Sequence, residues 1–276
     1  MTKTIVITGA TRGIGRATAL RLLEDGHNVV LNYHADEANA AETLAACRAA
    51  GARTGASTGA KPNAKTGGEG GAGGEGGEGG GAAMAVKADI ARRGEVERLM
   101  AAALERFGAI DVLINNAGLN IDRPLFELSE SDWDRVIETN MKAVFLTCQA
   151  AGRIMVGQAA GGHIVNLGAL TGITGRANGL NYCASKAGVM VMTKCLAIEL
   201  APKVRVNCVL PGTIRTPEVD ERYDLAANEP AMAAKILAGR IGEPEEVAAA
   251  IRFLISDDGG YVNGQKLIVD GGSFLY

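Results

Sequence analysis

An open α/β fold, with a doubly wound seven-stranded parallel sheet and helices on both faces, is predicted by two features of the sequence. Short β-branched runs alternate with longer segments of helical pattern, which is typical of βαβ units and of a parallel sheet covered on both sides. The 276 residues are 47% hydrophobic, which is enough to bury a large core, and α/β domains of about 250 residues are often single. We therefore expect residues 1–276 to form one domain.

The elements follow one another in the order that βαβ units require. The chain enters a β-branched run almost at once, at Thr4–Ile7, and Pro244 opens the last predicted helix. Between that run and that helix, residues 215–240 are expected to form a mobile helical lid. Because crossovers between parallel strands are right-handed, the ligand crevice is expected at the carboxyl ends of the strands. Strands are predicted near residues 3–8, 28–33, 84–88, 110–114, 162–167, 204–210 and 266–269, and helices near residues 13–25, 36–50, 93–107, 131–157, 181–200 and 243–255.

One segment interrupts this order between the second helix and the third strand. Eleven of the fifteen residues from Gly67 to Gly81 are glycine and three of the others are glutamate, so the segment cannot bury a core. With the residues before it, it forms a Gly-rich insertion loop, placed at residues 54–82. Loop closure costs only about 0.6 kcal/mol per doubling of length, so a surface insertion is tolerable. We expect a disordered spacer in preference to a segment that contacts a partner.

Composition and charge limit the classes of function. The formal net charge is −3, which provides no global field to attract nucleic acid or an anionic membrane, and neither partner is expected. The five cysteines are widely spaced and odd in number, which fits a reducing cytoplasm. No uninterrupted apolar run reaches the roughly 18 residues that a membrane span needs. The three histidines are scattered, so no metal site is expected.

A glycine-rich turn, T-G-A-T-R-G-I-G from Thr8 to Gly15, follows the first strand and opens the first helix. This context favours a dinucleotide site, because glycine lets the backbone approach a pyrophosphate and the N–H groups at the helix start favour its negative charge. The motif N-N-A-G at Asn115–Gly118, after the fourth strand, strengthens this interpretation. From the turn and this motif, the predicted cofactor-binding residues are Gly9, Thr11, Arg12, Gly13, Ile14, Gly15, Asn116, Ala117 and Gly118.

The choice between NADP(H) and NAD(H) depends on the end of the second strand. An acidic residue there accepts the ribose hydroxyls in NAD enzymes and would repel a 2′-phosphate. Here the position is Tyr33, with His34 next to it and Arg12 inside the glycine turn. A phosphate would meet positive or neutral groups, so NADP(H) is favoured over NAD(H), with Tyr33 and His34 in the cofactor site.

A second motif places Tyr182 and Lys186 four residues apart, on one face of the helix after the fifth strand. Asn140 lies on the long fourth helix. With the glycine turn and N-N-A-G, these residues resemble the short-chain dehydrogenase/reductase family, most closely its 3-oxoacyl-[acyl-carrier-protein] reductase-like members. The resemblance runs from Lys3 to the tail Val269–Gly272, interrupted by the one insertion, and implies a Rossmann fold.

The resemblance implies a catalytic role for three of these residues. Tyr182 gives a proton to a carbonyl oxygen while hydride arrives from the nicotinamide, Lys186 holds the ribose and lowers the pKa of the phenol, and Asn140 supports the lysine through a water. A cation about 4 Å away, at an effective dielectric of about 20, is worth up to about 4 kcal/mol, so Tyr182 is expected to work near neutrality. Both Tyr182 and Lys186 also belong to the cofactor site.

The resemblance also implies the remaining cofactor contacts. Asp89 and Ile90 should flank the adenine, although Asp89 could equally cap the following helix. Asn116 should help to hold the loop after the fourth strand. The segment 211–216 should close over the nicotinamide, with Pro211, Gly212, Ile214 and Thr216 in contact.

The fourth catalytic position breaks the pattern. The family carries a serine there that hydrogen-bonds the substrate carbonyl, and this chain has Ala169, thirteen residues before Tyr182. Losing one such donor typically costs about 10²- to 10³-fold in rate, which weakens a reductase without abolishing it. Three explanations remain open: an engineered substitution, a natural one in which Thr171 or a substrate group supplies the donor, or a protein that has given up redox chemistry.

Substrate and assembly follow less directly. The segment Val156–Gly162, which matches the docking surface for a carrier protein, is bare of charge, although Lys203 retains one basic group. The charged run in the lid, which includes Glu218 and Arg222, is interpreted as a solvated face. Acyl thioesters, small alcohols and ketones, and secondary-metabolite carbonyls all remain as substrates. A homotetramer is expected; the alternative function is a binding subunit without turnover in a hetero-oligomer.

Overall fold

The computed structural model describes residues 1–57 and 81–275, and it contains the doubly wound fold that the sequence predicts. Seven parallel strands form one sheet in the order β3-β2-β1-β4-β5-β6-β7. The order reverses between β1 and β4, which is the topological switch point where open α/β sheets bind ligands. In chain order the strands are β1 (Thr4–Ile7), β2 (Asn28–Tyr33), β3 (Ala83–Lys87), β4 (Val112–Asn115), β5 (Gly162–Leu167), β6 (Val204–Pro211) and β7 (Lys266–Val269).

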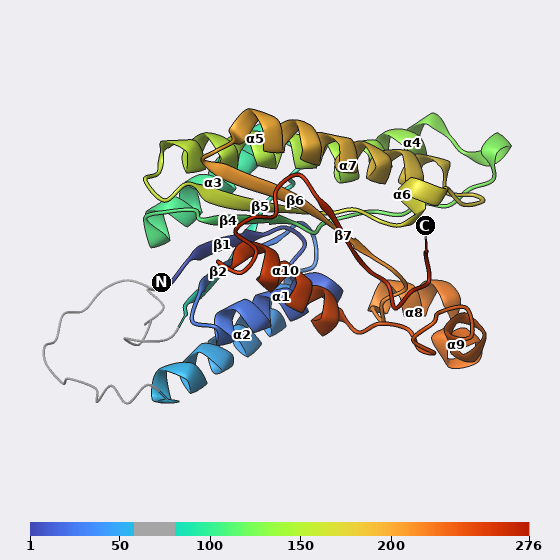
Figure 1. Cartoon of the computed structure of the whole chain (residues 1–276), viewed down its shortest axis with the longest axis horizontal. Coiled ribbons are helices and arrows are strands. Elements are labelled where there is room, and N and C mark those ends of the chain that lie inside the picture. The colour runs from blue at the N-terminus through green and yellow to red at the C-terminus, as the bar shows by residue number, and fades with distance from the viewer. Residues whose placement is uncertain (58–80, 276) are drawn as a thin grey trace, which may run out of the picture.

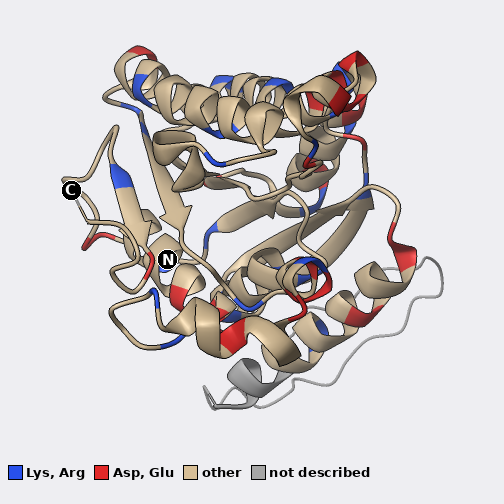
Figure 2. Cartoon of the chain, turned by 90° about the vertical axis from the view of Figure 1, so that its right-hand side faces the viewer, with Lys and Arg blue, Asp and Glu red and all other residues tan. Residues whose placement is uncertain are grey.

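Helices cover both faces of the sheet (Figure 1). One layer consists of α1 (Gly13–Glu24), α2 (Glu37–Ser57) and α10 (Pro244–Ile255). The opposite layer consists of α3 (Arg93–Phe107), α4 (Glu130–Ile137), α5 (Ala143–Gly157) and α7 (Leu180–Leu200). On the side drawn in Figure 2, acidic and basic residues are interspersed over the helices.

The two faces of the sheet have separate hydrophobic cores, and successive residues of each strand alternate between them. In β1, Ile5 and Ile7 pack in the core under α1 and α10, whereas Val6 packs in the core under α3, α5 and α7. β4 behaves in the same way, since Val112 and Leu113 belong to different cores. All five side chains are completely buried. Because both faces of the sheet are covered, the strands are mainly apolar at successive positions and do not alternate between apolar and polar residues.

Two predicted helices differ from the observed ones. The helix predicted to end near residue 50 continues to Ser57, so the first residues of the predicted insertion, 54–57, are helical. Most of the glycine run after it lies outside the described residues. The helix predicted over residues 131–157 is divided into α4 and α5 by a π-helical segment, η2 (Glu138–Lys142), where an extra residue is accommodated within the helix.

The region 215–240 contains two short helices, α8 (Pro217–Tyr223) and α9 (Leu225–Ala233), at one end of the molecule (Figure 1). They share a small hydrophobic cluster formed by Leu225, Ile236 and Ile241. Two other short elements, η1 (Leu125–Glu127) and α6 (Thr171–Thr174), lie in the loops after β4 and β5. In the parts of the chain that the structure covers, no helix combines the length and the apolar character needed to cross a membrane.

Candidate active site

A cavity of about 470 Å³ lies at the carboxyl ends of the strands, beside the switch point between β1 and β4. Its walls come from the turn after β1, the loops after β4, β5 and β6, and the start of α7 and α8. The sequence-predicted residues that line it are Gly9, Thr11, Arg12, Gly13, Ile14, Asn116, Ala117, Gly118, Ala169, Thr171, Tyr182, Lys186, Pro211, Gly212, Ile214 and Thr216.

The glycine turn after β1 requires glycine at two positions. Gly9 has φ +59°, and a β-carbon on it would lie 2.9 Å from the Cα of Ala117 in the loop after β4. Gly15 is the third residue of α1, and a β-carbon there would collide with the carbonyl of Gly9 and would lie 2.6 Å from Nδ2 of Asn116. Since neither position has room for a side chain, the turn and the β4 loop can approach closely beside the start of α1.

Asn116 ties the loop after β4 to this turn. Its side-chain amide donates to the carbonyls of Thr8, at 3.0 Å, and Gly9, at 2.8 Å. In return, the hydroxyl of Thr8 accepts from the backbone N–H groups of Asn116 and Ala117, at 3.0 and 3.1 Å. These four bonds fix the two glycine-containing loops in one orientation at the edge of the cavity.

The residues predicted around the adenine and its ribose lie beyond the cavity wall. Tyr33 ends β2 and is half-buried, and His34 follows it and is exposed. Ile90 is buried, and Asp89 accepts a hydrogen bond at 3.0 Å from the N–H of Ala91, two residues on. Asp89 therefore stabilises the turn before α3, but it is not the cap of that helix, because the N-cap residue is Arg92.

Arg12 and the loop after β6 also line the cavity, and the two segments lie close together, since a β-carbon on Gly13 would lie 3.1 Å from Cγ2 of Thr216. Arg12 is exposed at the N-cap of α1, where its guanidinium is available to a ligand on the phosphate side. The loop after β6 begins at Gly212, where a β-carbon would lie 2.7 Å from Cβ of Asp270. Ile214 forms an isolated bridge with Gly242. Thr216 then caps α8 by accepting from the N–H of Val219, at 3.3 Å.

Tyr182 and Lys186 line the same cavity from the start of α7. Both lie in the first two turns of α7, and the Nζ of Lys186 is 5.8 Å from the centroid of the Tyr182 ring. The same Nζ donates to the carbonyl of Leu167, the last residue of β5, at 2.8 Å. Lys186 is buried and Tyr182 is half-buried. The hydrogen bond to the end of β5 therefore fixes the lysine amine near the Tyr182 ring.

The acidity of this pair differs from the prediction. Burial raises the pKa of Tyr182 well above its ordinary value, and the nearby carboxylate of Glu218 raises it further, while Arg176 opposes both. Burial lowers the pKa of Lys186 to about 8, so part of its charge is lost near neutrality. The prediction that the phenol pKa is lowered is therefore wrong for the protein without cofactor, because desolvation dominates and the cation that opposes it is Arg176.

Asn140 lies in the π-helical segment η2 and is completely buried. Its amide accepts from the N–H of Leu119 at 2.7 Å and donates to the carbonyl of Leu119 at 2.8 Å and to the hydroxyl of Ser185 at 3.1 Å. A β-carbon on Gly118 would lie 3.6 Å from both the Oδ1 of Asn140 and the Nζ of Lys186. Asn140 thus fixes the β4 loop against α7, next to the lysine.

Ala169 lines the cavity at the position where the sequence predicts a missing donor. Thr171, its suggested substitute, does not continue an extended strand, because β5 ends at Leu167 and Thr171 begins α6. The Oγ1 atom of Thr171 is buried without a hydrogen-bond partner. Its hydroxyl therefore does not face open space in the cavity, and the structure offers no replacement for the serine hydroxyl at this point.

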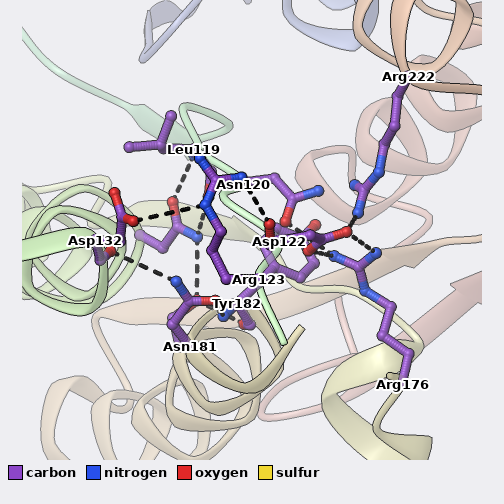
Figure 3. Close-up of polar contacts among 11 residues, drawn as sticks. Leu119, Asn120, Asp122, Arg123, Asp132, Arg176, Asn181, Tyr182 and Arg222 are labelled. Carbon is purple, nitrogen blue, oxygen red and sulfur yellow. Dashed lines mark hydrogen bonds and ion pairs between the residues drawn. The ribbon is translucent and has the colours of Figure 1, made fainter. Parts of the chain in front are cut away.

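Sequence reasoning missed a charged cluster beside Tyr182, which Figure 3 shows. Arg176, in the loop between α6 and α7, donates to both carboxylate oxygens of Asp122, at 2.8 and 2.7 Å. Arg222, which the sequence suggested to be solvated, extends from α8 to the same carboxylate. The guanidinium of Arg176 lies 5.2 Å from the centroid of the Tyr182 ring. Asp122, Arg176 and Arg222 are 46 to 100 residues apart along the chain, so no short sequence motif predicts that they meet.

Comparison with known proteins agrees with this geometry. The family model described as "short chain dehydrogenase" matches residues 3–60, and the one described as "Enoyl-(Acyl carrier protein) reductase" matches residues 72–273. The chain is 40% identical to a 3-oxoacyl-[acyl-carrier-protein] reductase of Synechocystis sp., over 98% of this chain and 96% of that protein. It is 37% identical to 3beta-hydroxysteroid dehydrogenase 1 of Eggerthella lenta, over 99% of this chain and 94% of that protein.

A solved structure shows the same fold over nearly the whole length. A short-chain type dehydrogenase/reductase from Mycobacterium marinum superposes with a TM-score of 0.82 at 30% identity, covering 98% of this chain and 95% of that chain. The matches extend from the glycine turn through the Tyr182–Lys186 helix to the residues after β7. The chain is therefore an NAD(P)-dependent oxidoreductase of the short-chain dehydrogenase/reductase family.

Proposed function

We propose that the protein is an NADPH-dependent reductase that converts a ketone, 3-oxoacyl or related, to an alcohol, with Ala169 in place of the usual catalytic serine. The observation that supports this most strongly is the shared cavity, which is lined both by the glycine turn and by Tyr182 and Lys186. The cofactor, when bound, supplies hydride. Tyr182, whose proton is firmly held, donates that proton to the carbonyl oxygen as hydride reaches the carbonyl carbon.

The other proposed roles follow from the contacts of each residue. Lys186, held by the carbonyl of Leu167, stabilises the charge that develops on the phenol oxygen and holds the ribose. Asn140 supports the β4 loop beside the lysine. The glycine turn and Asn116 hold the pyrophosphate, and the segment after β6 covers the nicotinamide. For the adenine end we propose Tyr33, His34, Asp89 and Ile90.

A second candidate, binding of cofactor or substrate without turnover, is favoured by one observation. Ala169 has no donor for the carbonyl oxygen, and the hydroxyl of Thr171 does not replace it. The test is NADPH oxidation with a panel of activated ketones, together with NADPH affinity measured by fluorescence. Slow turnover supports the reductase, whereas tight NADPH binding with no turnover supports the binding protein.

Preference for NADPH over NADH is expected to depend on Arg12. Its guanidinium is exposed beside the turn, where it can form a charge-assisted hydrogen bond with a 2′-phosphate. Arg12→Gln is expected to raise KM for NADPH about tenfold, which corresponds to about 1.4 kcal/mol, and to leave KM for NADH unchanged. Arg16→Gln is the matched control, because Arg16 lies on the same helix but pairs with Glu42 at 2.8 Å. Equal effects of both variants would remove Arg12 from the phosphate site.

Reduction is expected to slow as pH rises through about 8. Lys186 has a pKa lowered to about 8 by burial, so its cation is present below this pH and lost above it. Tyr182 has a raised pKa, so it keeps its proton over the same interval and does not contribute a second step. The measurement is kcat/KM against pH, which reports groups of the free enzyme. A profile that rises with pH above about 8 would contradict the assignment.

Substrate class, assembly and compartment complete the proposal. Acyl thioesters remain candidates from the Synechocystis relative, and Lys203 lies beside the uncharged 156–162 segment, where it donates to the carbonyl of Ala159 at 3.5 Å. A homotetramer is supported by exposed apolar side chains on two helices of one layer: Phe145 on α5, and Val191 and Ile198 on α7. The five free cysteines fit a reducing cytoplasm.

A further inference from the structure

Two arginines near Tyr182 line the cavity, whereas the carboxylate that pairs with them does not. Arg176 and Arg222 both line the cavity, and Asp122 does not. Arg222 contacts the Oδ2 atom of Asp122, which also accepts from Arg176 at 2.8 Å (Figure 3). A single carboxylate therefore serves two guanidinium groups, and one positive charge in this arginine pair is not balanced by Asp122.

The hydrogen bonds of Arg176 leave one donor free of a partner. Its two terminal nitrogens are occupied by Asp122 and by the side-chain oxygen of Asn120, at 2.9 Å, but its Nε is buried and makes no hydrogen bond. A buried donor without a partner costs about 1 to 3 kcal/mol, so the contacts with Asp122 and Asn120 leave Arg176 incompletely satisfied. Because Arg176 lines the cavity and its guanidinium stacks beside the Tyr182 ring, an acceptor on a ligand that contacts this side chain would lie close to the reacting carbonyl.

Among the described residues that line the cavity, the one carboxylate is that of Glu218, on α8. It lines the cavity but is exposed, so solvent screens it more than it screens the arginines, whose side chains are only 20% and 25% exposed. Arg222 lies on α8, outside the two helical layers, and its present partner is a carboxylate. The arginine pair thus already binds one carboxylate, that of Asp122. A carboxylate on a ligand would suit the pair in the same way, because the forked guanidinium group matches the geometry of a carboxylate.

We propose that the substrate is an oxo acid whose free carboxylate binds Arg176 and Arg222, which would make these two residues determinants of specificity for a charged ketone. The inference rests on the proposed reductase function. Among the candidate substrates it favours a ketone that carries a carboxylate, because a thioester or a simple ketone has no charge for this arginine pair to bind.

The test compares each acid with its neutral ester. 3-Oxobutanoate and 4-oxopentanoate, each beside its methyl ester, are assayed with NADPH, and their binding to the protein saturated with NADP⁺ is measured by calorimetry. We expect the wild type to favour at least one acid over its ester by about tenfold or more in both measurements. Arg176→Gln and Arg222→Gln should reduce this preference to near one, since a lost charge-assisted bond is worth about 1.5 to 3 kcal/mol.

Arg123→Gln is the matched control. Arg123 lies in the same loop as Asp122, but it does not line the cavity and instead lies 3.9 Å from Asp132. This variant should keep the wild-type preference. Esters that bind as well as the acids, or an acid preference that survives in both test variants, would overturn the inference. Absence of NADPH oxidation with every compound, while an acid still binds in preference to its ester, would instead remove the proposed reductase and leave the carboxylate site.

Discussion

Replacing Tyr182 with phenylalanine is expected to lower kcat for ketone reduction about 10³-fold, the middle of the range for loss of a positioned general acid. The ring lies near two cations, with Arg176 at 5.2 Å and Lys186 at 5.8 Å from its centroid. Phenylalanine keeps that packing and removes only the hydroxyl, so the change isolates proton donation. The measurement is single-turnover reduction of an activated ketone by enzyme loaded with NADPH.

Two controls separate chemistry from binding. The dissociation constant for NADPH should change less than threefold in Tyr182→Phe, since the turn, Asn116 and Lys186 are untouched, and threefold corresponds to only about 0.65 kcal/mol. Tyr261→Phe should behave as the wild type, because Tyr261 is fully exposed and does not line the cavity. Turnover in Tyr182→Phe within tenfold of the wild type would mean that another group donates the proton.

The sequence contains the local parts of this site because each is a short pattern with a fixed backbone consequence. Gly9 and Gly15 occupy positions where a β-carbon would collide with the neighbouring loop, so the glycine pattern predicts that the turn and the β4 loop approach each other closely. Tyr182 and Lys186 share a helix face through their spacing alone. Strands were predictable to within two residues at each end for the same reason, since their apolar runs are bounded by loops.

Parts of the site that depend on distant contacts could not be predicted in this way. Arg176 meets Asp122 from 54 positions away, and nothing near either residue signals the pairing. The π-helical segment that carries Asn140 has an ordinary helical sequence, and only the folded backbone shows it. The contacts of the Asn140 amide with the backbone of Leu119 and the hydroxyl of Ser185 likewise join residues that are far apart in the sequence. The raised pKa of Tyr182 likewise follows from burial, which spacing does not report.

Restoring a hydroxyl at position 169 is expected to raise kcat about 10²-fold, the lower end of the loss that removing one oxyanion donor causes. Ala169 lines the cavity directly before α6, so a serine oxygen there would point toward the space that a carbonyl occupies beside Tyr182. Ala169→Ser should leave the affinity for NADPH unchanged, because the glycine turn, Asn116 and Lys186 are untouched. The measurement is kcat for an activated ketone with NADPH saturating.

Thr171→Val decides whether the chain already has a substitute donor. The hydroxyl of Thr171 is buried without a partner, so its removal should leave kcat within about threefold, and burying a methyl group in its place is neutral or stabilising. In the double variant the gain from Ala169→Ser should be unchanged, since the two positions then act independently. A loss near 10²-fold in Thr171→Val, recovered by Ala169→Ser, would instead identify Thr171 as the donor. If neither Ala169→Ser nor the wild type reduces any ketone while NADPH binds tightly, the site serves binding alone.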